Sequence, residues 1–241
     1  MKIFSVIISP NRKKEVLESC LRQMQSESKN PLFLATLNPE ILLKARKDKK
    51  YQKILNSAKI KLIDGFGIKL LSWLKKEQVG DRITGADLAE SLIKIAEESN
   101  LKTGIIYNEN GLSSRQEIEK SLVNFKKIIL CGMKKNNTQF NDLKLLENCQ
   151  LILVATGFPY QEELIYNELL KLPNLKIAMG IGGTLDFWTK KKLRAPEIIR
   201  AIGFEWLWRL LIQPNRIFRI LRAVVIFPFF VLIENNDKSR N

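Results

Sequence analysis

Short apolar runs alternate with helical patterns along most of the chain. The apolar runs predict strands at 3–8, 32–35, 60–63, 103–107, 127–130, 151–155 and 175–179. The periodic segments between them predict helices at 12–26, 39–56, 66–75, 85–99, 112–123, 139–147, 160–171 and 195–212. This alternation predicts an α/β fold with a mostly parallel, Rossmann-like sheet and helices on both faces. Ligands of such sheets bind at the carboxyl ends of the strands.

The pattern changes near Arg194-Ala-Pro196, after which the chain becomes helical and basic. We therefore expect an α/β core at 1–194, a helical, basic, membrane-associating appendage at 195–233 and a polar, frayed tail at 234–241. From Phe187 to Arg222 there are nine Lys or Arg against two Glu. The resulting net charge of +7 is about half of the +15 of the whole chain. Clustered positive charge among tryptophans and aliphatic residues indicates an anionic partner, such as a membrane surface or a phosphate.

The apolar end of this region is too short to cross a bilayer. Its longest uncharged run, 223–233, has eleven residues and contains Pro228, whereas a spanning helix needs roughly 20. Residues 1–10 also lack the features of a secretory signal. We expect a cytoplasmic protein that lies peripherally on the inner face of the membrane. A subunit interface would also bury this apolar surface, which leaves a homo-oligomer open.

Composition excludes several kinds of catalytic site. The chain has no histidine, which rules out a Ser-His-Asp or Cys-His nucleophile and disfavours a zinc enzyme. Cys20, Cys131 and Cys149 are widely spaced and form no CxxC motif, so we expect small buried residues in a reducing compartment. No Asp-x-Asp occurs either. A carboxylate pair that would carry a divalent ion to a diphosphate is therefore missing, and we expect no metal and no cofactor.

Polar residues follow the predicted strands. Thr36 and Asn38 come after the second run, and Asp64 comes after the third, ahead of a Gly-x-Gly that would let a ligand approach its carboxylate. Simple helix capping accounts for Asn38 and is an equal alternative for Asp64. Arg82 precedes a helix opened by Thr84, Gly85 or Asp87, an arrangement typical of a phosphate site.

Two later strand exits also carry candidate residues. Gln161 and Glu162 lie in the first turn of the helix that follows the strand at 151–155. The glycine-rich exit at 178–187 lacks the Lys of a P-loop, which disfavours ATP hydrolysis. A departing diphosphate would then depend on arginines and helix N-termini.

Taken together, the motifs resemble the WecG/TagA/CpsF family of bacterial glycosyltransferases. The resemblance extends from about residue 31 to 222 and rests on Thr36-Leu-Asn-Pro-Glu40, Ile63-Asp-Gly-Phe-Gly67, Arg82-Ile-Thr-Gly-Ala-Asp-Leu88, Gly157-Phe-Pro-Tyr-Gln-Glu162, Gly180-Ile-Gly-Gly-Thr-Leu-Asp-Phe187, Arg194-Ala-Pro196, Gly203-Phe-Glu-Trp-Leu-Trp-Arg-Leu210 and Pro214-Asn-Arg216. Each motif is weak alone, but their order along the chain is specific. Leu37 and Tyr160 stand where family members often have Pro and Lys. The first change alters only the turn, whereas the second removes a positive charge near the expected site and so leaves the donor preference open.

The resemblance implies an inverting, metal-independent transfer of an N-acetylmannosamine-type sugar. The donor would be a UDP-sugar, and the acceptor a polyprenyl-diphosphate-linked amino sugar used in cell-surface polysaccharide synthesis. By motif, Asp64 would be the general base, and Thr36 and Asn38 would hold the donor sugar. Arg82 and Gln161 would contact the nucleotide or its diphosphate. The appendage would supply Arg209, Arg216 and Arg219 to close the site and help bind an anionic membrane.

Two other classes of protein remain as alternatives. A nucleic-acid-binding protein would fit the net charge, but the chain carries no recognisable DNA- or RNA-binding motif. A nucleotide-binding oxidoreductase is disfavoured because the third glycine of the dinucleotide fingerprint and the expected acidic residue after it are missing. We therefore expect no nucleic-acid partner.

Overall fold

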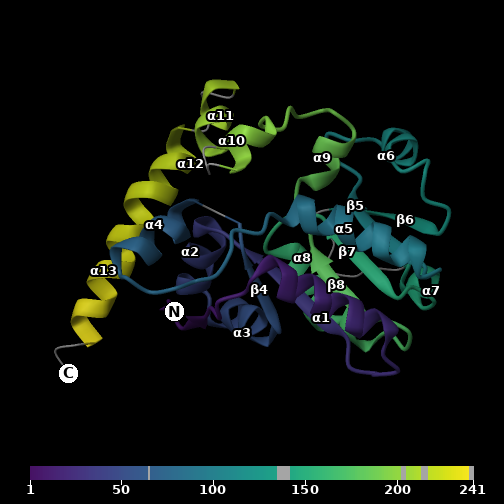
Figure 1. Ribbon diagram of the computed structural model, residues 1–241, viewed down its shortest axis with the longest axis horizontal. Coiled ribbons are helices and arrows are strands. Elements are labelled where there is room, and N and C mark those ends of the chain that lie inside the picture. The colour runs from purple at the N-terminus through teal and green to yellow at the C-terminus, as the bar shows by residue number, and fades with distance from the viewer. Residues whose placement is uncertain (65, 135–141, 202–204, 213–216, 239–241) are drawn as a thin grey trace.

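The computed structural model describes residues 1–64, 66–134, 142–201, 205–212 and 217–238. Its centre is a parallel sheet of six strands in the order β4-β3-β8-β7-β5-β6 (Figure 1). The strands are β3 (Leu32–Leu37), β4 (Ile60–Ile63), β5 (Thr103–Asn108), β6 (Ile128–Met133), β7 (Leu151–Ala155) and β8 (Ile177–Gly180). The predicted fold class and the strands from residue 32 onward are confirmed.

Helices cover both faces of the sheet, because each central strand is apolar on both sides. Phe33, Ala35 and Leu37 of β3 belong to one buried cluster, whereas Leu32 and Leu34 belong to a second. The first cluster includes residues of α2 (Pro39–Lys47), α3 (Lys49–Ser57) and α8 (Tyr160–Asn167). The second includes residues of α1 (Lys13–Gln25), α5 (Gly85–Glu98) and α6 (Arg115–Ser121). Continuous apolar strands thus lie between two helical layers, as parallel sheets require.

The described part of the core contains further helices besides these. They are α4 (Phe66–Leu74), α7 (Leu143–Leu146), the 3-10 helix η1 (Leu169–Lys171) and α9 (Thr184–Trp188). Of the helix predicted at 139–147, the first three residues lie outside the described residues. Cys20, Cys131 and Cys149 are buried and free, which confirms the expectation that they are buried residues.

The prediction of a first sheet strand at 3–8 is wrong. That segment instead forms a hairpin of its own, in which β1 (Lys2–Ile3) pairs with β2 (Val6–Ile7) in antiparallel fashion. Phe4 and Ser5 have φ angles of 46° and 63°, so the chain reverses within two residues. Left-handed conformations at two successive residues are typical of the tight turns that close hairpins.

The single helix predicted at 39–56 is divided at Asp48. Asp48 is extended, with φ −131° and ψ 100°, and its Oδ1 accepts a hydrogen bond from the backbone N–H of Tyr51 at 3.0 Å. The side chain thereby caps the start of α3, and it also forms an ion pair with Lys44 at the end of α2. The apolar periodicity continues through the break because both helices bury the same side.

The chain after β8 ends in a series of helices along one end of the molecule (Figure 1). They are α10 (Glu197–Ala201), α11 (Glu205–Ile212), α12 (Ile217–Leu221), the π-helical segment η3 (Arg222–Ile226) and α13 (Phe227–Lys238). The helix α13 continues past residue 233, into the segment for which we expected a polar, frayed tail.

The last helix is anchored on the N-terminal hairpin and α2. Phe227 is fully buried and meets Phe4 edge-on, with ring centroids 6.0 Å apart. The guanidinium of Arg46 lies 4.2 Å from the centroid of the Phe230 ring and contacts Glu234. The hairpin therefore serves to receive the C-terminal helix rather than to extend the sheet.

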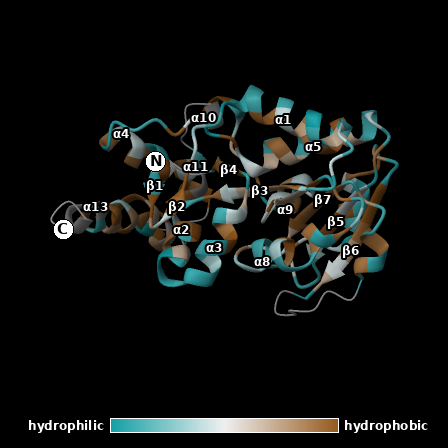
Figure 2. Cartoon of the chain, turned by 90° about the horizontal axis from the view of Figure 1, so that it is seen from below, coloured by the Kyte–Doolittle hydropathy of each residue, from teal (hydrophilic) through white to brown (hydrophobic). Residues whose placement is uncertain are grey.

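This series of C-terminal helices keeps apolar residues exposed, and Figure 2 shows hydrophobic colouring along α13. Among its exposed side chains, Leu211 is 71% and Phe218 73% accessible. Within the described parts of the chain, no helix combines the length and the hydropathy needed to cross a bilayer.

Candidate active site

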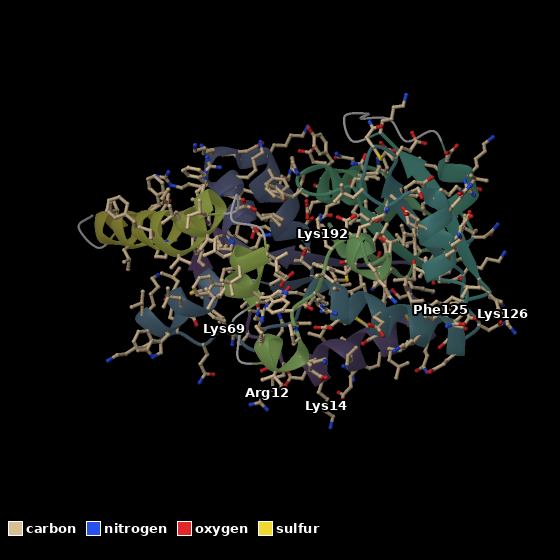
Figure 3. The ribbon with its side chains drawn as sticks, turned by 90° about the horizontal axis from the view of Figure 1, so that it is seen from above. Arg12, Lys14, Lys69, Phe125, Lys126 and Lys192 are labelled. Carbon is tan, nitrogen blue, oxygen red and sulfur yellow. The ribbon has the colours of Figure 1, made fainter. Side chains whose placement is uncertain are left out.

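A cavity of about 420 Å³ lies at the carboxyl ends of β3, β4, β7 and β8. Polar side chains, glycines and cations line it together, in line with the rule that parallel sheets bind ligands at this edge. They include Thr36, Asn38, Asp64, Thr84, Gly157, Gln161, Gly182, Gly183, Lys192, Arg194 and Glu205. In Figure 3, Lys192 lies near the centre of the molecule, whereas Lys14 and Lys126 extend from its edges.

Asp64 lies between two neighbouring strands and the start of α5. Its backbone N–H donates to the carbonyl of Leu37, the last residue of β3, at 2.9 Å. Its Oδ2 lies 3.5 Å from the backbone nitrogen of Gly85, the first residue of α5, which donates to it. The positive end of the helix dipole therefore faces the carboxylate. Asp64 is partly exposed to the cavity, as an acceptor of a substrate proton must be.

Thr36 and Asn38 join Asp64 in the cavity, and both have structural partners. Thr36 as a residue is only 8% exposed, and its hydroxyl donates to the carbonyl of Gly180 at 3.4 Å. The Asn38 Oδ1 accepts from the backbone N–H of Ile41 at 3.0 Å and caps α2. Capping orients Asn38 without excluding it from the cavity, because its Nδ2 remains a donor.

Gln161 also lines the cavity and is held from two sides. Its Nε2 donates to Glu162 Oε1 at 2.6 Å, and its Oε1 accepts from the backbone N–H of Gly182 at 3.0 Å. Glu162 is fully buried and also accepts from the Tyr51 hydroxyl at 3.0 Å. Burial raises the pKa of the Glu162 carboxyl to about 7, and burial also raises the pKa of the Tyr51 phenol.

Arg82 lies beside the cavity but does not line it. Its Nη2 donates to Glu205 Oε2 at 2.7 Å, and the two side chains are 19% and 5% exposed. Glu205 is the first residue of α11 and does line the cavity. The cation predicted to meet a phosphate is thus paired with a carboxylate that comes from the C-terminal helices.

Two cations that line the cavity, Lys192 and Arg194, were not predicted as site residues from the sequence. Lys192 forms an ion pair with Asp186, and Arg194 Nη2 donates to Asp87 Oδ1 at 2.7 Å and to Thr84 Oγ1 at 3.2 Å. The signal for Arg194 was present, because Arg194-Ala-Pro196 is one of the motifs that carry the family resemblance. Nothing local in the sequence distinguishes Lys192 from Lys190 and Lys191.

A second cavity, of about 300 Å³, adjoins the first. Both are lined by Gly157, Gly182, Gly183 and Lys192, so the glycine-rich strand exits form their common wall. The second cavity extends over the ends of β5 and β7, where Thr156 lies. The Thr156 hydroxyl is buried and has no hydrogen-bond partner among the described residues. Its hydrogen-bonding capacity is therefore not used by the described residues.

The glycine at position 67 has a different role from the one predicted. A Cβ there would lie 2.9 Å from Pro39 Cγ and would collide with the carbonyl oxygen of Ala223 in η3. The close approach made possible by this glycine is therefore the approach of the C-terminal helices to α4 and α2. Gly65 lies outside the described residues.

The three predicted arginines of the appendage are placed only by their elements. Arg209 belongs to α11 and Arg219 to α12, but the positions of their side chains are outside the description, and Arg216 lies outside the described residues. Among the residues that the structure describes, no three acidic or thiol side chains gather as metal ligands would.

Comparisons with known proteins agree with these features. The model of the glycosyl transferase WecG/TagA/CpsF family matches residues 1–241. The N-acetylglucosaminyldiphosphoundecaprenol N-acetyl-beta-D-mannosaminyltransferase of Staphylococcus aureus (strain MRSA252) is 30% identical over 222 residues, which cover 89% of this chain and 85% of that protein. The enzyme of the same name from Bacillus subtilis (strain 168) is 28% identical over 210 residues, covering 86% and 81%.

Proposed function

The chain belongs to the WecG/TagA/CpsF family and is a glycosyltransferase, and we propose from this premise that it is an inverting enzyme that needs no metal. The donor in this proposal is a UDP-linked N-acetylmannosamine-type sugar. The acceptor is a polyprenyl-diphosphate-linked amino sugar used in cell-surface polysaccharide synthesis. The names of the relatives support both sugars, since those proteins are mannosaminyltransferases acting on a diphosphoundecaprenol-linked N-acetylglucosamine.

The observation that carries the proposal is the Asp64 carboxylate in a cavity that also holds Thr36, Asn38 and Gln161. Asp64 takes the proton of the acceptor hydroxyl, and the oxygen attacks the anomeric carbon of the donor. The bond from that carbon to the diphosphate breaks on the opposite face, and UDP leaves with the electron pair. Thr36 and Asn38 hold the donor sugar beside the base. Inversion follows because attack and departure lie on opposite faces.

The departing diphosphate is assigned to the wall shared by the two cavities. Lys192 provides positive charge in this wall and Arg194 in the rest of the first cavity, and the glycines leave space for phosphate oxygens to approach the backbone. The nucleoside then occupies the second cavity, where the Thr156 hydroxyl offers a hydrogen bond. Cations take the part that a divalent ion has in other sugar-nucleotide enzymes.

The appendage at 195–233 completes the site in this proposal. Glu205 brings the start of α11 to the cavity and to Arg82, and Arg209, Arg216 and Arg219 follow within the next turns of chain. We assign these arginines to the diphosphates of donor or acceptor. The exposed apolar residues of the same helices would enter the interface of an anionic membrane, where the lipid-linked acceptor resides.

Asp64→Asn tests the base. The substitution preserves shape but removes the basic oxygen, so the turnover number falls by about 10²–10⁴-fold while UDP affinity changes little. Asp81→Asn is the matched control, because Asp81 lies outside both cavities and its carboxylate accepts from the backbone of Lys13. Turnover would be followed with a UDP-sugar and a short polyprenyl-diphosphate acceptor. Unchanged turnover in Asp64→Asn refutes the assignment.

The same assay tests independence of metal. A chelator such as EDTA leaves the rate unchanged if the cations of the chain stabilise the leaving group. Strong inhibition that Mg²⁺ or Mn²⁺ reverses would contradict this part of the proposal.

Sedimentation with anionic liposomes tests the membrane surface. Leu211→Glu with Phe218→Glu places charge on two side chains that are 71% and 73% exposed, and should abolish binding. Val123→Glu is the control, since Val123 is 76% exposed but follows α6, at the other end of the molecule (Figure 1). Equal binding by both variants would place the membrane contact elsewhere.

A further inference from the structure

Behind the cavity wall, a buried carboxylate connects α3 to the glycine-rich exit of β8. Glu162 accepts from Tyr51 at 3.0 Å and from Gln161 at 2.6 Å, and Gln161 in turn accepts from the N–H of Gly182 at 3.0 Å. Tyr51 and Glu162 are inaccessible to solvent, and neither lines the cavity. The connected groups therefore extend from the core to the cavity wall, which only Gln161 and Gly182 reach.

A carboxylate at this position needs an explanation. The neighbouring core positions of α8 are Leu164 and Ile165, and an aliphatic residue at 162 would pack there without desolvating a charge. A buried ionisable group is weak evidence for stability, because well-packed hydrophobic residues usually serve as well or better. The role of Glu162 is better sought in what its oxygens hold.

The two partners of Gln161 fix which end of its carboxamide faces which way. The backbone N–H of Gly182 can only donate, so it must meet the carboxamide oxygen, and this turns the NH₂ group towards Glu162 Oε1, which accepts from it. The two ends of a carboxamide are nearly equal in shape, so packing alone would not distinguish them. One N–H of Gln161 is used by Glu162, which leaves the second as a donor at the cavity.

The fit of Gln161 against β8 is tight. A Cβ at position 180 would lie 2.5 Å from Gln161 Nε2 and 2.8 Å from its Cδ. Gly180 thus gives the carboxamide its place at the end of the strand, and the amide cannot rotate freely within it. Any ligand bound in the cavity beside Gln161 therefore meets a donor of fixed direction.

We infer that Tyr51 and Glu162 are positioning residues, which hold the Gln161 carboxamide so that its free N–H faces the phosphate oxygens of the donor. The inference rests on the proposed function, in which Gln161 contacts the nucleotide or its diphosphate. A reversed amide would present its carbonyl oxygen to an anionic diphosphate and repel it. Glu162 therefore acts on donor binding through Gln161 alone and does not touch the substrate.

Substitution of Glu162 by Met and by Gln separates this role from simple packing. Met fills the space but cannot accept from Gln161, whereas Gln can still present an oxygen to Gln161 and an NH₂ to Tyr51. We expect Glu162→Met to weaken UDP binding about 10-fold, the effect of one lost hydrogen bond, and to raise KM for the UDP-sugar more than it lowers kcat. Glu162→Gln should restore binding to within about 3-fold of the wild-type protein.

A double-mutant cycle then shows whether the effect passes through Gln161. UDP affinity is measured by titration calorimetry for the wild-type protein, Gln161→Ala, Glu162→Met and the double variant. The inference requires that Glu162→Met has no further effect on UDP affinity once Gln161 is Ala. If Glu162→Met leaves the Tyr51 hydroxyl without a partner and folds poorly, Tyr51→Phe with Glu162→Met replaces it in the cycle.

The outcomes distinguish this inference from the function on which it rests. An equal loss of affinity in both backgrounds, or a Glu162→Gln variant as weak as Glu162→Met, overturns the positioning role while leaving the glycosyltransferase proposal intact. If the wild-type protein binds neither UDP nor a UDP-sugar, the proposed donor is wrong and the inference falls with it.

Discussion

The ion pair between Arg82 and Glu205 connects the α/β core to the C-terminal helices, and its strength can be measured. The two side chains come from segments 123 residues apart and meet at 2.7 Å. They are 19% and 5% exposed, so water screens their attraction poorly. We consider the variants Arg82→Ala, Glu205→Ala and their combination.

The magnitude follows from burial and geometry. A hydrogen bond between charged groups contributes about 1.5–3 kcal/mol. Removing one member of a buried pair costs more, about 3–5 kcal/mol, because the other charge remains buried without its counterion. The losses in free energy of unfolding of the two single variants should therefore add up to more than the loss in the double variant. The expected coupling energy from the cycle is about 1.5–3 kcal/mol.

Urea unfolding gives the stabilities for this cycle, and amide hydrogen exchange shows where the loss is felt. Exchange should increase first in α11, which begins at Glu205. The pair Arg115–Glu119 serves as control, since its nitrogen and oxygen are equally close at 2.8 Å but the side chains are 59% and 50% exposed. A coupling between Arg82 and Glu205 no larger than in this surface pair would refute the reasoning.

Two more predictions concern the packing of the C-terminal helices and the buried carboxylate. Gly67→Val should lower the free energy of unfolding by about 1–3 kcal/mol and make η3 accessible to protease, because a side chain there collides with Ala223; unaltered protection of η3 would contradict this. Burial raises the pKa of Glu162 from 4.5 to about 7, so the folded state binds the proton more tightly than the unfolded state. The protonated carboxyl thereby adds about 3 kcal/mol to the free energy of unfolding below pH 4.5, and this contribution is lost as the pH rises to about 7. Urea titrations at each pH should therefore show the stability of the wild-type protein falling across that range relative to Glu162→Gln. Parallel pH profiles for the two proteins would show that the folded-state pKa is not raised.

The residues at the strand ends could be predicted because the apolar runs of the sequence show where each strand ends. Thr36, Asn38 and Asp64 directly follow apolar strands, and parallel strands bring their carboxyl ends to one edge, so their meeting needs no tertiary detail. Gln161 was predictable for the same reason. The prediction of a first sheet strand was wrong because the apolar run at 3–8 gives no sign of the left-handed turn at Phe4 and Ser5.

The pairing of Arg82 could not be predicted, since it depends on the path of the chain after β8. Sequence reasoning placed Arg82 near a helix N-terminus, and a phosphate was the natural partner. Its partner in the structure, Glu205, comes from α11. Lys192 enters the cavity for a similar reason, because the turn after α9 determines which of three consecutive lysines faces inward.

The C-terminal helices have an inward and an outward side. The inward side includes the buried Glu205 and Phe227, and the outward side includes the exposed Leu211 and Phe218. Burying a phenylalanine contributes about 1.5–3 kcal/mol, which holds α13 against the core with a strength comparable to the Arg82–Glu205 contact. By linkage, whatever binds the outward side only in this arrangement also raises the fraction of molecules in which Glu205 meets Arg82. A partner of that kind would therefore also favour the proposed completion of the cavity by α11.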